Sequence, residues 1–75
     1  MYFVEIERNG VSTQLGEPVA NVETAIATCA QRINIAVSLV GDGHRFRLTN
    51  EGNPLSETEQ AAWEAGAAAN GFNTY

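Results

Sequence analysis

Between residues 21 and 34, apolar side chains recur every three or four positions, the spacing of residues on one face of an α-helix. Asn21 can cap this helix, because its short side-chain oxygen accepts an unpaired backbone N–H of the first turn. The pattern predicts a helix over 22–33 that ends near Asn34. Its apolar face consists of Val22, Ala25, Ile26, Cys29, Ala30 and Ile33.

Residues 2–8 and 11–15 alternate between apolar and polar side chains, which is typical of β-strands with one buried face. The Asn9-Gly10 pair between them favours a two-residue type I′ turn and so predicts a hairpin. With that turn, Val4 faces Leu15 across the ribbon. The apolar face then holds Val4, Ile6, Val11 and Leu15, and the opposite, solvated face holds Phe3, Glu5, Glu7, Ser12 and Gln14.

A second pair of alternating stretches, residues 35–40 and 45–49, is separated by a Gly-Asp-Gly turn at 41–43. It predicts a second hairpin, although the flexible turn also allows a longer loop. With a two-residue loop, Phe46 and Leu48 lie on the apolar side, opposite Leu39 and Val37. Arg45 and Arg47 then point to the other side.

The stretch Ser56-Glu57-Thr58-Glu59 is a capping box, in which the first and last side chains each bond the other's backbone N–H. It predicts a second helix that continues to about Asn70. Gly71 can take the left-handed closing position, and Phe72 can fold back onto the last turn. Trp63 is the single large apolar anchor of this alanine-rich helix.

These elements predict an α+β fold of order ββαββα, a four-stranded antiparallel sheet with two helices packed on one face. At 75 residues the chain, 1–75, is expected to form a single small α+β domain. If strand 2–8 lies beside strand 45–49, Glu5 and Glu7 can pair with Arg45 and Arg47 on the outer face of the sheet.

The chain carries nine acidic and four basic residues, all four of them arginines, for a formal net charge of −5. This balance argues against general nucleic-acid binding and against binding to an anionic membrane, whereas it favours attraction to a basic partner. The N-terminal residues lack a basic signal-peptide region, and no apolar run is long enough to span a membrane. We therefore expect a cytoplasmic protein. Because so small a core leaves a thin stability margin, a homodimer is also compatible with the sequence.

The sequence contains no recognisable catalytic, cofactor-binding or metal-binding constellation. Cys29 is the only cysteine and lies on the apolar face of the first predicted helix, which is typical of a buried, inert thiol. His44 is the only histidine and follows the turn of the second hairpin. Glu5 and Glu7 share one face of a strand, but an open sheet is expected to provide no cleft for acid–base chemistry. We therefore predict that the protein is not an enzyme and needs no cofactor.

Two surfaces are candidate partner-binding sites. On the outer sheet face, Arg45 and Arg47 combine positive charge with the apolar ring of Phe3, a composition found in protein interfaces and in surfaces that stack bases. On the second helix, Glu57, Glu59 and Glu64 form an acidic patch that could occupy a basic groove. The simpler interpretation is that the glutamates cap the helix and that both surfaces are only solvated.

In size, acidity and lack of a catalytic signature, the chain resembles the small inhibitory or accessory proteins of phages and mobile elements, including anti-CRISPR proteins. The resemblance is one of composition and implies a non-enzymatic protein-binding module, an inhibitor of a nucleic-acid-handling partner. Two alternatives stay open: a structural homo-oligomeric accessory protein joined through an edge strand or the outer face, and a weak single-stranded nucleic-acid binder.

Overall fold

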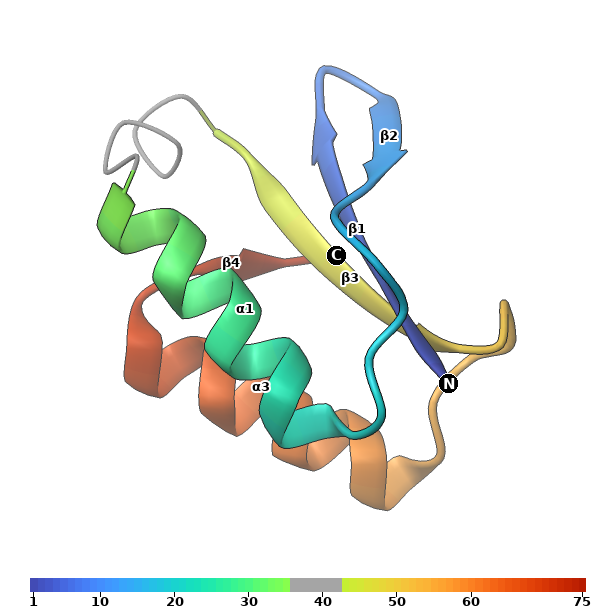
Figure 1. Cartoon of the computed structure of the whole chain (residues 1–75). Helices are drawn as coiled ribbons and strands as arrows, with labels where there is room; N and C mark the ends of the chain where they lie inside the picture. Colours follow the sequence, from blue (N-terminus) through green and yellow to red (C-terminus); the bar gives the residue numbers. More distant parts are fainter. Residues whose placement is uncertain (36–42) are drawn as a thin grey trace.

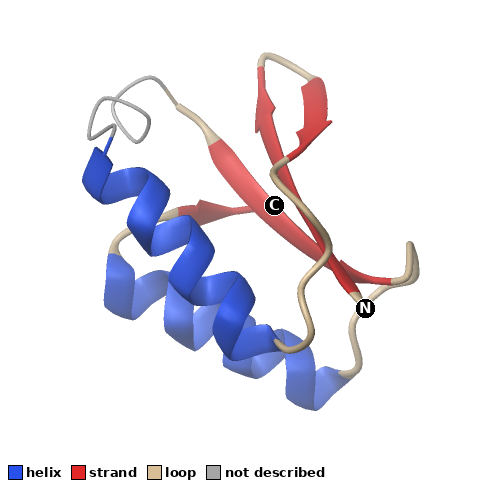
Figure 2. Cartoon of the chain, viewed as in Figure 1, coloured by secondary structure: helices blue, strands red, loops and turns tan. Residues whose placement is uncertain are grey.

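A computed structural model describes residues 1–35 and 43–75 (Figure 1). The chain forms a four-stranded sheet, and both helices lie on the same side of it (Figure 2). The α+β class and the two helices are therefore confirmed. In chain order the elements are β1 (Tyr2–Arg8), β2 (Val11–Gln14), α1 (Val22–Ile35), β3 (Arg45–Asn50), α3 (Glu57–Asn70) and β4 (Asn73–Thr74).

The first hairpin has the predicted turn and register. Asn9 and Gly10 both have positive φ angles, 54° and 82°, as a type I′ turn requires. Arg8 lies opposite Val11, and the Leu15 amide donates to the Val4 carbonyl at 2.7 Å. The turn chemistry alone therefore set the pairing of β1 with β2.

The strand order, which the sequence left open, is β2-β1-β3-β4, so β3 lies beside β1. These two strands are antiparallel, and Glu5 lies opposite Arg47. The fully antiparallel sheet is wrong, because the short strand β4 pairs in parallel with β3. The described elements have the order β-β-α-β-α-β, which differs from the expected ββαββα in ending on β4 after α3. A strand that follows a helical crossover from its neighbour is parallel to it, and α3 is such a crossover between β3 and β4.

The predicted strand at 35–40 and its turn fall on residues 36–42, which lie outside the described residues. Only its first residue can be compared. Ile35 belongs to α1 and its side chain is 75% exposed, so the helix extends past the predicted end near Asn34.

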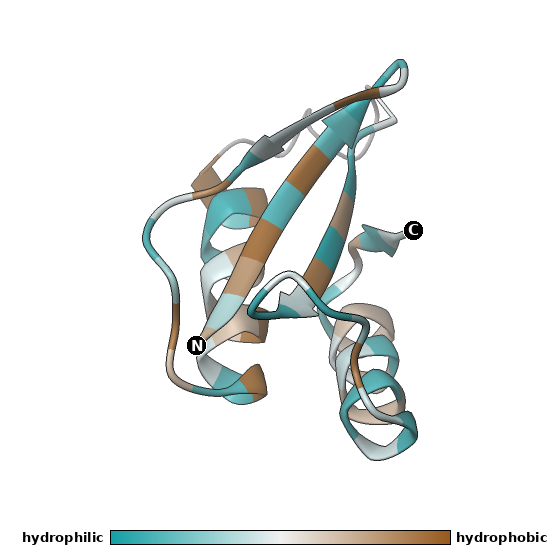
Figure 3. Cartoon of the chain, turned by 90° about the vertical axis from the view of Figure 1, so that its right-hand side faces the viewer, coloured by the Kyte–Doolittle hydropathy of each residue, from teal (hydrophilic) through white to brown (hydrophobic). Residues whose placement is uncertain are grey.

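The core lies between the sheet and the helices, and its largest fully buried side chains are Trp63 and Phe46. The Phe72 ring lies 5.3 Å from each of these two rings, measured between centroids. Apolar and polar residues alternate along β1, which gives the sheet one face toward this core (Figure 3). Among the described residues, the other buried apolar side chains are Val4, Leu15, Ala25, Cys29, Leu48 and Ala67.

Two residues of the first hairpin depart from the predicted division of faces. Val11 was expected on the apolar face and is 68% exposed, because β2 is the outermost strand and all four of its residues are exposed. Glu7 was expected to be solvated and is only 6% exposed, because Arg45 and the Gly10 turn cover its carboxylate.

The predicted caps are confirmed at both ends of α3 and at the start of α1. The Asn21 side chain accepts the Thr24 amide at 2.8 Å. Ser56 and Glu59 form the reciprocal capping box. Gly71 is left-handed at φ 74°, and the next amide, that of Phe72, donates to the Ala67 carbonyl at 3.1 Å. Each of these groups bonds a backbone group that the helix itself leaves unpaired.

Candidate functional site

Two arginine–glutamate pairs lie side by side on the outer face of the sheet, the face turned away from the helices. Arg47 donates two hydrogen bonds to one oxygen of Glu5, at 2.6 Å from Nη2 and 3.2 Å from Nε. Arg45 binds one oxygen of Glu7 in the same way, with its Nε at 2.9 Å and its Nη2 also in contact. The neighbouring strands therefore make the cross-strand pairs that were expected if they lay side by side. About half of each arginine side chain stays exposed.

Tyr75, which directly follows β4, lies over this pair of arginines. Its ring centroid is 5.2 Å from the guanidinium carbon of Arg45 and 5.1 Å from that of Arg47, within the range of a cation–π contact. The Tyr75 and Ser12 hydroxyls are 2.6 Å apart, and the Tyr75 amide donates to the Phe46 carbonyl at 3.2 Å. The tyrosine therefore reaches from β3 across β1 to β2.

Sequence reasoning did not find Tyr75. Its partners are distant in the chain, Ser12 by 63 positions, and it lies outside every element that the pattern predicted. No local motif signals such a contact. Only the parallel return of β4 beside β3 brings the ring to the arginines.

The hydrogen bonds on this face favour the charged forms of its side chains. The Gly10 backbone N–H donates to Glu7 at 3.0 Å and, together with Arg45, lowers the pKa of this carboxyl against the opposing effect of its burial. The hydrogen bond to Glu5 raises the pKa of Arg47. The outer face is therefore ionic but nearly neutral in sum, because each of these guanidiniums has a carboxylate partner.

Phe3 lies on the same face of β1 as Glu5, opposite Thr49, and is half-buried. It is two residues away from Glu5 along the strand, at the far end of the arginine–glutamate ladder. The structure therefore brings Arg45 and Arg47 together with Tyr75, and leaves Phe3 at the margin of this cluster.

The three glutamates predicted as an acidic patch on the second helix have different roles. Glu57 and Glu64 are exposed. Glu59 accepts hydrogen bonds from the Ser56 amide and from the Tyr2 hydroxyl. These bonds, that of Tyr2 first, lower the pKa of Glu59, and the same contact raises the pKa of Tyr2. Glu59 therefore links β1 to the start of α3, and the acidic surface of this helix consists of Glu57 and Glu64.

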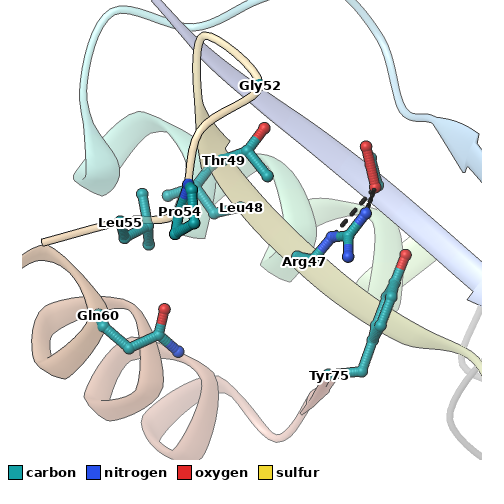
Figure 4. Close-up of a pocket in the computed structure, with 9 residues that line it drawn as sticks. Arg47, Leu48, Thr49, Gly52, Pro54, Leu55, Gln60 and Tyr75 are labelled. Atoms are coloured by element: carbon teal, nitrogen blue, oxygen red, sulfur yellow. Dashed lines mark hydrogen bonds and ion pairs between the residues drawn. The ribbon is translucent and has the colours of Figure 1, made fainter.

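A groove of about 330 Å³ opens beside β3, so the expectation that the sheet provides no cleft is wrong at this place. Arg47 and Tyr75 lie on one side of it and Gln60 of α3 on the other (Figure 4). Apolar side chains close one end. The lining residues are Glu5, Arg47, Leu48, Thr49, Gly52, Pro54, Leu55, Gln60 and Tyr75.

Within the part of the chain that the structure describes, no group of three or more histidine, cysteine, aspartate or glutamate side chains could hold a metal ion. Cys29 is fully buried, and burial raises the pKa of its thiol to about 12. His44 is half-exposed just before β3 and contributes to lowering the pKa of Glu7. In residues 1–35 and 43–75, neither helix is long and apolar enough to cross a membrane.

The surface that stands out is therefore the outer face at Tyr75, Arg45 and Arg47, together with the groove that adjoins it. Its chemistry is that of recognition, because it combines an aromatic ring, hydrogen-bond donors and a hollow with apolar walls. In comparisons with known proteins, no protein-family model, curated sequence or solved structure matches this chain.

Proposed function

We propose that this protein is a non-enzymatic protein-binding module that uses the outer face of its sheet. The observation that carries the proposal is the position of Tyr75 over two arginines that are half-exposed and already paired with glutamates. Tyrosine and arginine are the residues most enriched at the energetic centres of protein interfaces. Held in place by their own contacts, they lose little conformational freedom on binding.

The neutrality of this cluster favours a protein over a nucleic acid. A surface that binds a phosphate backbone gains affinity from cations that replace bound counterions. Arg45 and Arg47 each bind a carboxylate of β1, and the chain as a whole carries a net charge of −5. The aromatic rings could stack on bases, but the surrounding charge opposes the approach of a polyanion.

The acidity of the rest of the molecule supports a basic partner. Glu57 and Glu64 extend exposed negative charge along α3. Proteins that handle nucleic acids carry basic grooves, and an acidic module can occupy such a groove and block it. The finer form of the proposal is therefore an inhibitor of a nucleic-acid-handling protein, of the kind made by phages and mobile elements.

Site-specific photo-cross-linking in cells of the source organism tests the proposal. A benzoyl-phenylalanine in place of Tyr75 keeps an aromatic ring on the outer face, and the same cross-linker in place of Gln31 serves as control on the exposed side of α1. We expect position 75 to cross-link to one protein that position 31 does not capture. Equal capture at both positions, or none at position 75, would contradict the proposal.

Affinity for the purified partner then tests the residues themselves. The double variant Glu7→Gln/Arg45→Gln removes one guanidinium from the Tyr75 ring without leaving a buried carboxylate unpaired. We expect it to weaken binding about tenfold or more, as truncation of an interface anchor does. Gln31→Ala should leave the affinity unchanged. An inhibitor of nucleic-acid handling should also lose affinity in Glu57→Gln/Glu64→Gln, most clearly at low salt.

A second candidate is a homo-oligomer joined through β2. No strand of the described residues covers the outer edge of β2, its four residues are exposed, and none of them is charged or a proline. Edge strands without such protecting residues can pair with another chain. The test of this candidate is the oligomeric state of the chain and of an edge variant.

A further inference from the structure

The edge of β3 that faces away from β1 is only partly covered. β4 pairs with Arg45 and Phe46, and the Tyr75 amide adds a bond to the Phe46 carbonyl. Farther along, Asn50 bonds to Asn53 of the following turn. Between these two points, from Arg47 to Thr49, the structure places no strand of the described residues against this edge.

The backbone of Leu48 faces this open edge. In an antiparallel pair, the N–H and C=O groups of successive residues point alternately to opposite sides. Val4 lies opposite Leu48 and turns its carbonyl to Leu15 on β2, so this pair is not hydrogen-bonded between β1 and β3. Phe46 and Asn50, two residues before and after Leu48, both bond on the side away from β1. Leu48 therefore presents a backbone donor and acceptor on that side, where no described backbone group bonds to it.

The groove of about 330 Å³ lies at this same edge, and its walls differ in character. Leu48, Pro54 and Leu55 supply apolar surface at one end (Figure 4). The Tyr75 ring and the Gln60 amide face each other across the opening. A hollow of this size that combines apolar surface with hydrogen-bonding groups is suited to binding a ligand that has both kinds of group.

We propose that this groove binds an extended peptide segment of a partner protein, which adds to β3 as a short strand. The main chain of the segment pairs with the N–H and C=O of Leu48, the mode of recognition known as β-augmentation. The open edge from Arg47 to Thr49 accommodates about three residues of extended chain. This inference rests on the proposed protein-binding function and names the kind of segment that is bound.

The walls also specify the side chains of that segment. Successive residues of a strand point to opposite sides, so one side chain meets the apolar surface of Leu48 and Leu55 while its neighbours meet Tyr75 and Arg47. Glu5 already neutralises Arg47. The segment is therefore uncharged at this point, with a small apolar residue flanked by polar ones.

The experiment uses the full chain and a phage-displayed library of random heptapeptides as the probe. Peptides selected on the folded protein should slow hydrogen exchange of the Leu48 amide by about tenfold or more, measured by NMR, because this amide gains a main-chain partner. When the backbone nitrogens of the peptide are methylated one at a time, methylation at one of them should abolish binding, since it removes the donor for the Leu48 carbonyl.

Two matched glutamine-to-tryptophan variants locate the site. Gln60→Trp fills the groove from α3 and should weaken peptide binding about tenfold or more. Gln31→Trp makes the same change on α1, away from the groove, and should leave binding unchanged. The inference is overturned if the library yields no binder, if Leu48 exchange does not change, or if Gln60→Trp binds as tightly as the wild type.

The failure of this inference can be told apart from that of the proposed function. Arg45 does not line the groove, and Gln60 does not belong to the outer face. A partner that is captured at position 75 and is sensitive to Glu7→Gln/Arg45→Gln but indifferent to Gln60→Trp would refute the groove and leave the outer face standing. If peptides bind the groove but no partner is captured at position 75, the groove is supported and the proposed function of the outer face is refuted.

Discussion

At the scale of single residues, Glu7 shows how the fold changes the role of a side chain that its pattern assigns to solvent. It is the only polar or charged residue that is buried among residues 1–35 and 43–75. Its two oxygens accept hydrogen bonds from the Gly10 amide and the Arg45 guanidinium, so both oxygens of the carboxylate have partners inside the molecule. The outer face therefore depends on Glu7 for its order as well as for its neutrality.

The stability of the protein should consequently depend on pH through Glu7. Its pKa lies below the ordinary value of 4.5 in the folded state, so the ionised form stabilises the fold. This contribution is complete above the unfolded pKa and is lost as the pH falls through the lower, folded pKa. We expect the free energy of unfolding, measured with urea from pH 7 down to pH 3, to fall less steeply in Glu7→Gln than in the wild type.

The matched control for this measurement is Glu64→Gln, which removes the same charge from the exposed surface of α3. Glu7→Gln should also be less stable than Glu64→Gln at pH 7, because it weakens the contacts to Gly10 and Arg45. Parallel pH curves for Glu7→Gln and the wild type would show that this carboxyl does not contribute in the way described.

At the scale of elements, the two helices are in close contact where Ile26 of α1 packs over Gly66 of α3. A Cβ built at Gly66 would lie 2.3 Å from the Ile26 Cδ1 and 2.8 Å from its Cγ1. The alanine-rich sequence of α3 gave no sign that this glycine, inside the helix, is a contact point. The contact explains why a residue of low helix propensity stands at that position.

A double-mutant cycle tests this contact. In the wild type, Gly66→Ala should destabilise the protein by about 1 kcal/mol, since the clash with Ile26 outweighs the gain in helix propensity. In an Ile26→Ala background the same change should stabilise by up to about 1 kcal/mol, because the space is then free. Urea unfolding measures all four proteins. Equal effects of Gly66→Ala in both backgrounds would exclude the steric explanation.

At the scale of the whole molecule, the two edges of the sheet are not alike. β4 closes part of one edge and leaves the groove beside it, whereas β2 leaves the other edge uncovered by any described strand. Leu15 bonds toward β1, so by alternation Ser12 and Gln14 direct their backbone groups outward. A second copy of the chain could pair there.

Sedimentation over a range of concentrations tests the homo-oligomer candidate. Under this candidate the wild type forms a concentration-dependent dimer, and Gln14→Pro is monomeric because proline lacks the outward N–H. Gln14→Ala keeps that N–H and should dimerise like the wild type. A wild type that stays monomeric at every concentration would discard the candidate and leave the outer face as the main interaction surface.

Much of the fold could be predicted from the sequence because its signals are local. The Asn9-Gly10 turn, the Asn21 cap, the capping box at Ser56 and Glu59 and the Gly71 terminus each involve groups within about five positions of one another. Such contacts depend on the backbone conformation of a few residues. Distant parts of the chain do not change them, so the local sequence is sufficient.

The candidate site was predicted only in part, because it joins residues that are far apart in the sequence. The alternation placed Arg45 and Arg47 on the same outer face as Glu5 and Glu7, since a two-residue period assigns each side chain to a face. Whether they would meet depended on the strand order, which that period does not determine. That period says nothing about Tyr75, about the groove, or about which glutamate becomes buried. Those depend on which strands are neighbours and on how far each one extends.

The sequence by itself determined the helices, their caps, the first hairpin and the face on which the arginines of β3 and the glutamates of β1 lie, because local propensity and periodicity are properties of short stretches of chain. The tertiary structure alone decided that β4 runs parallel to β3, that Tyr75 covers the arginines, and that the edge at Leu48 stays open. These features join groups as far apart as Ser12 and Tyr75, 63 positions along the chain. Their free energy comes from packing the whole domain, which no short stretch encodes.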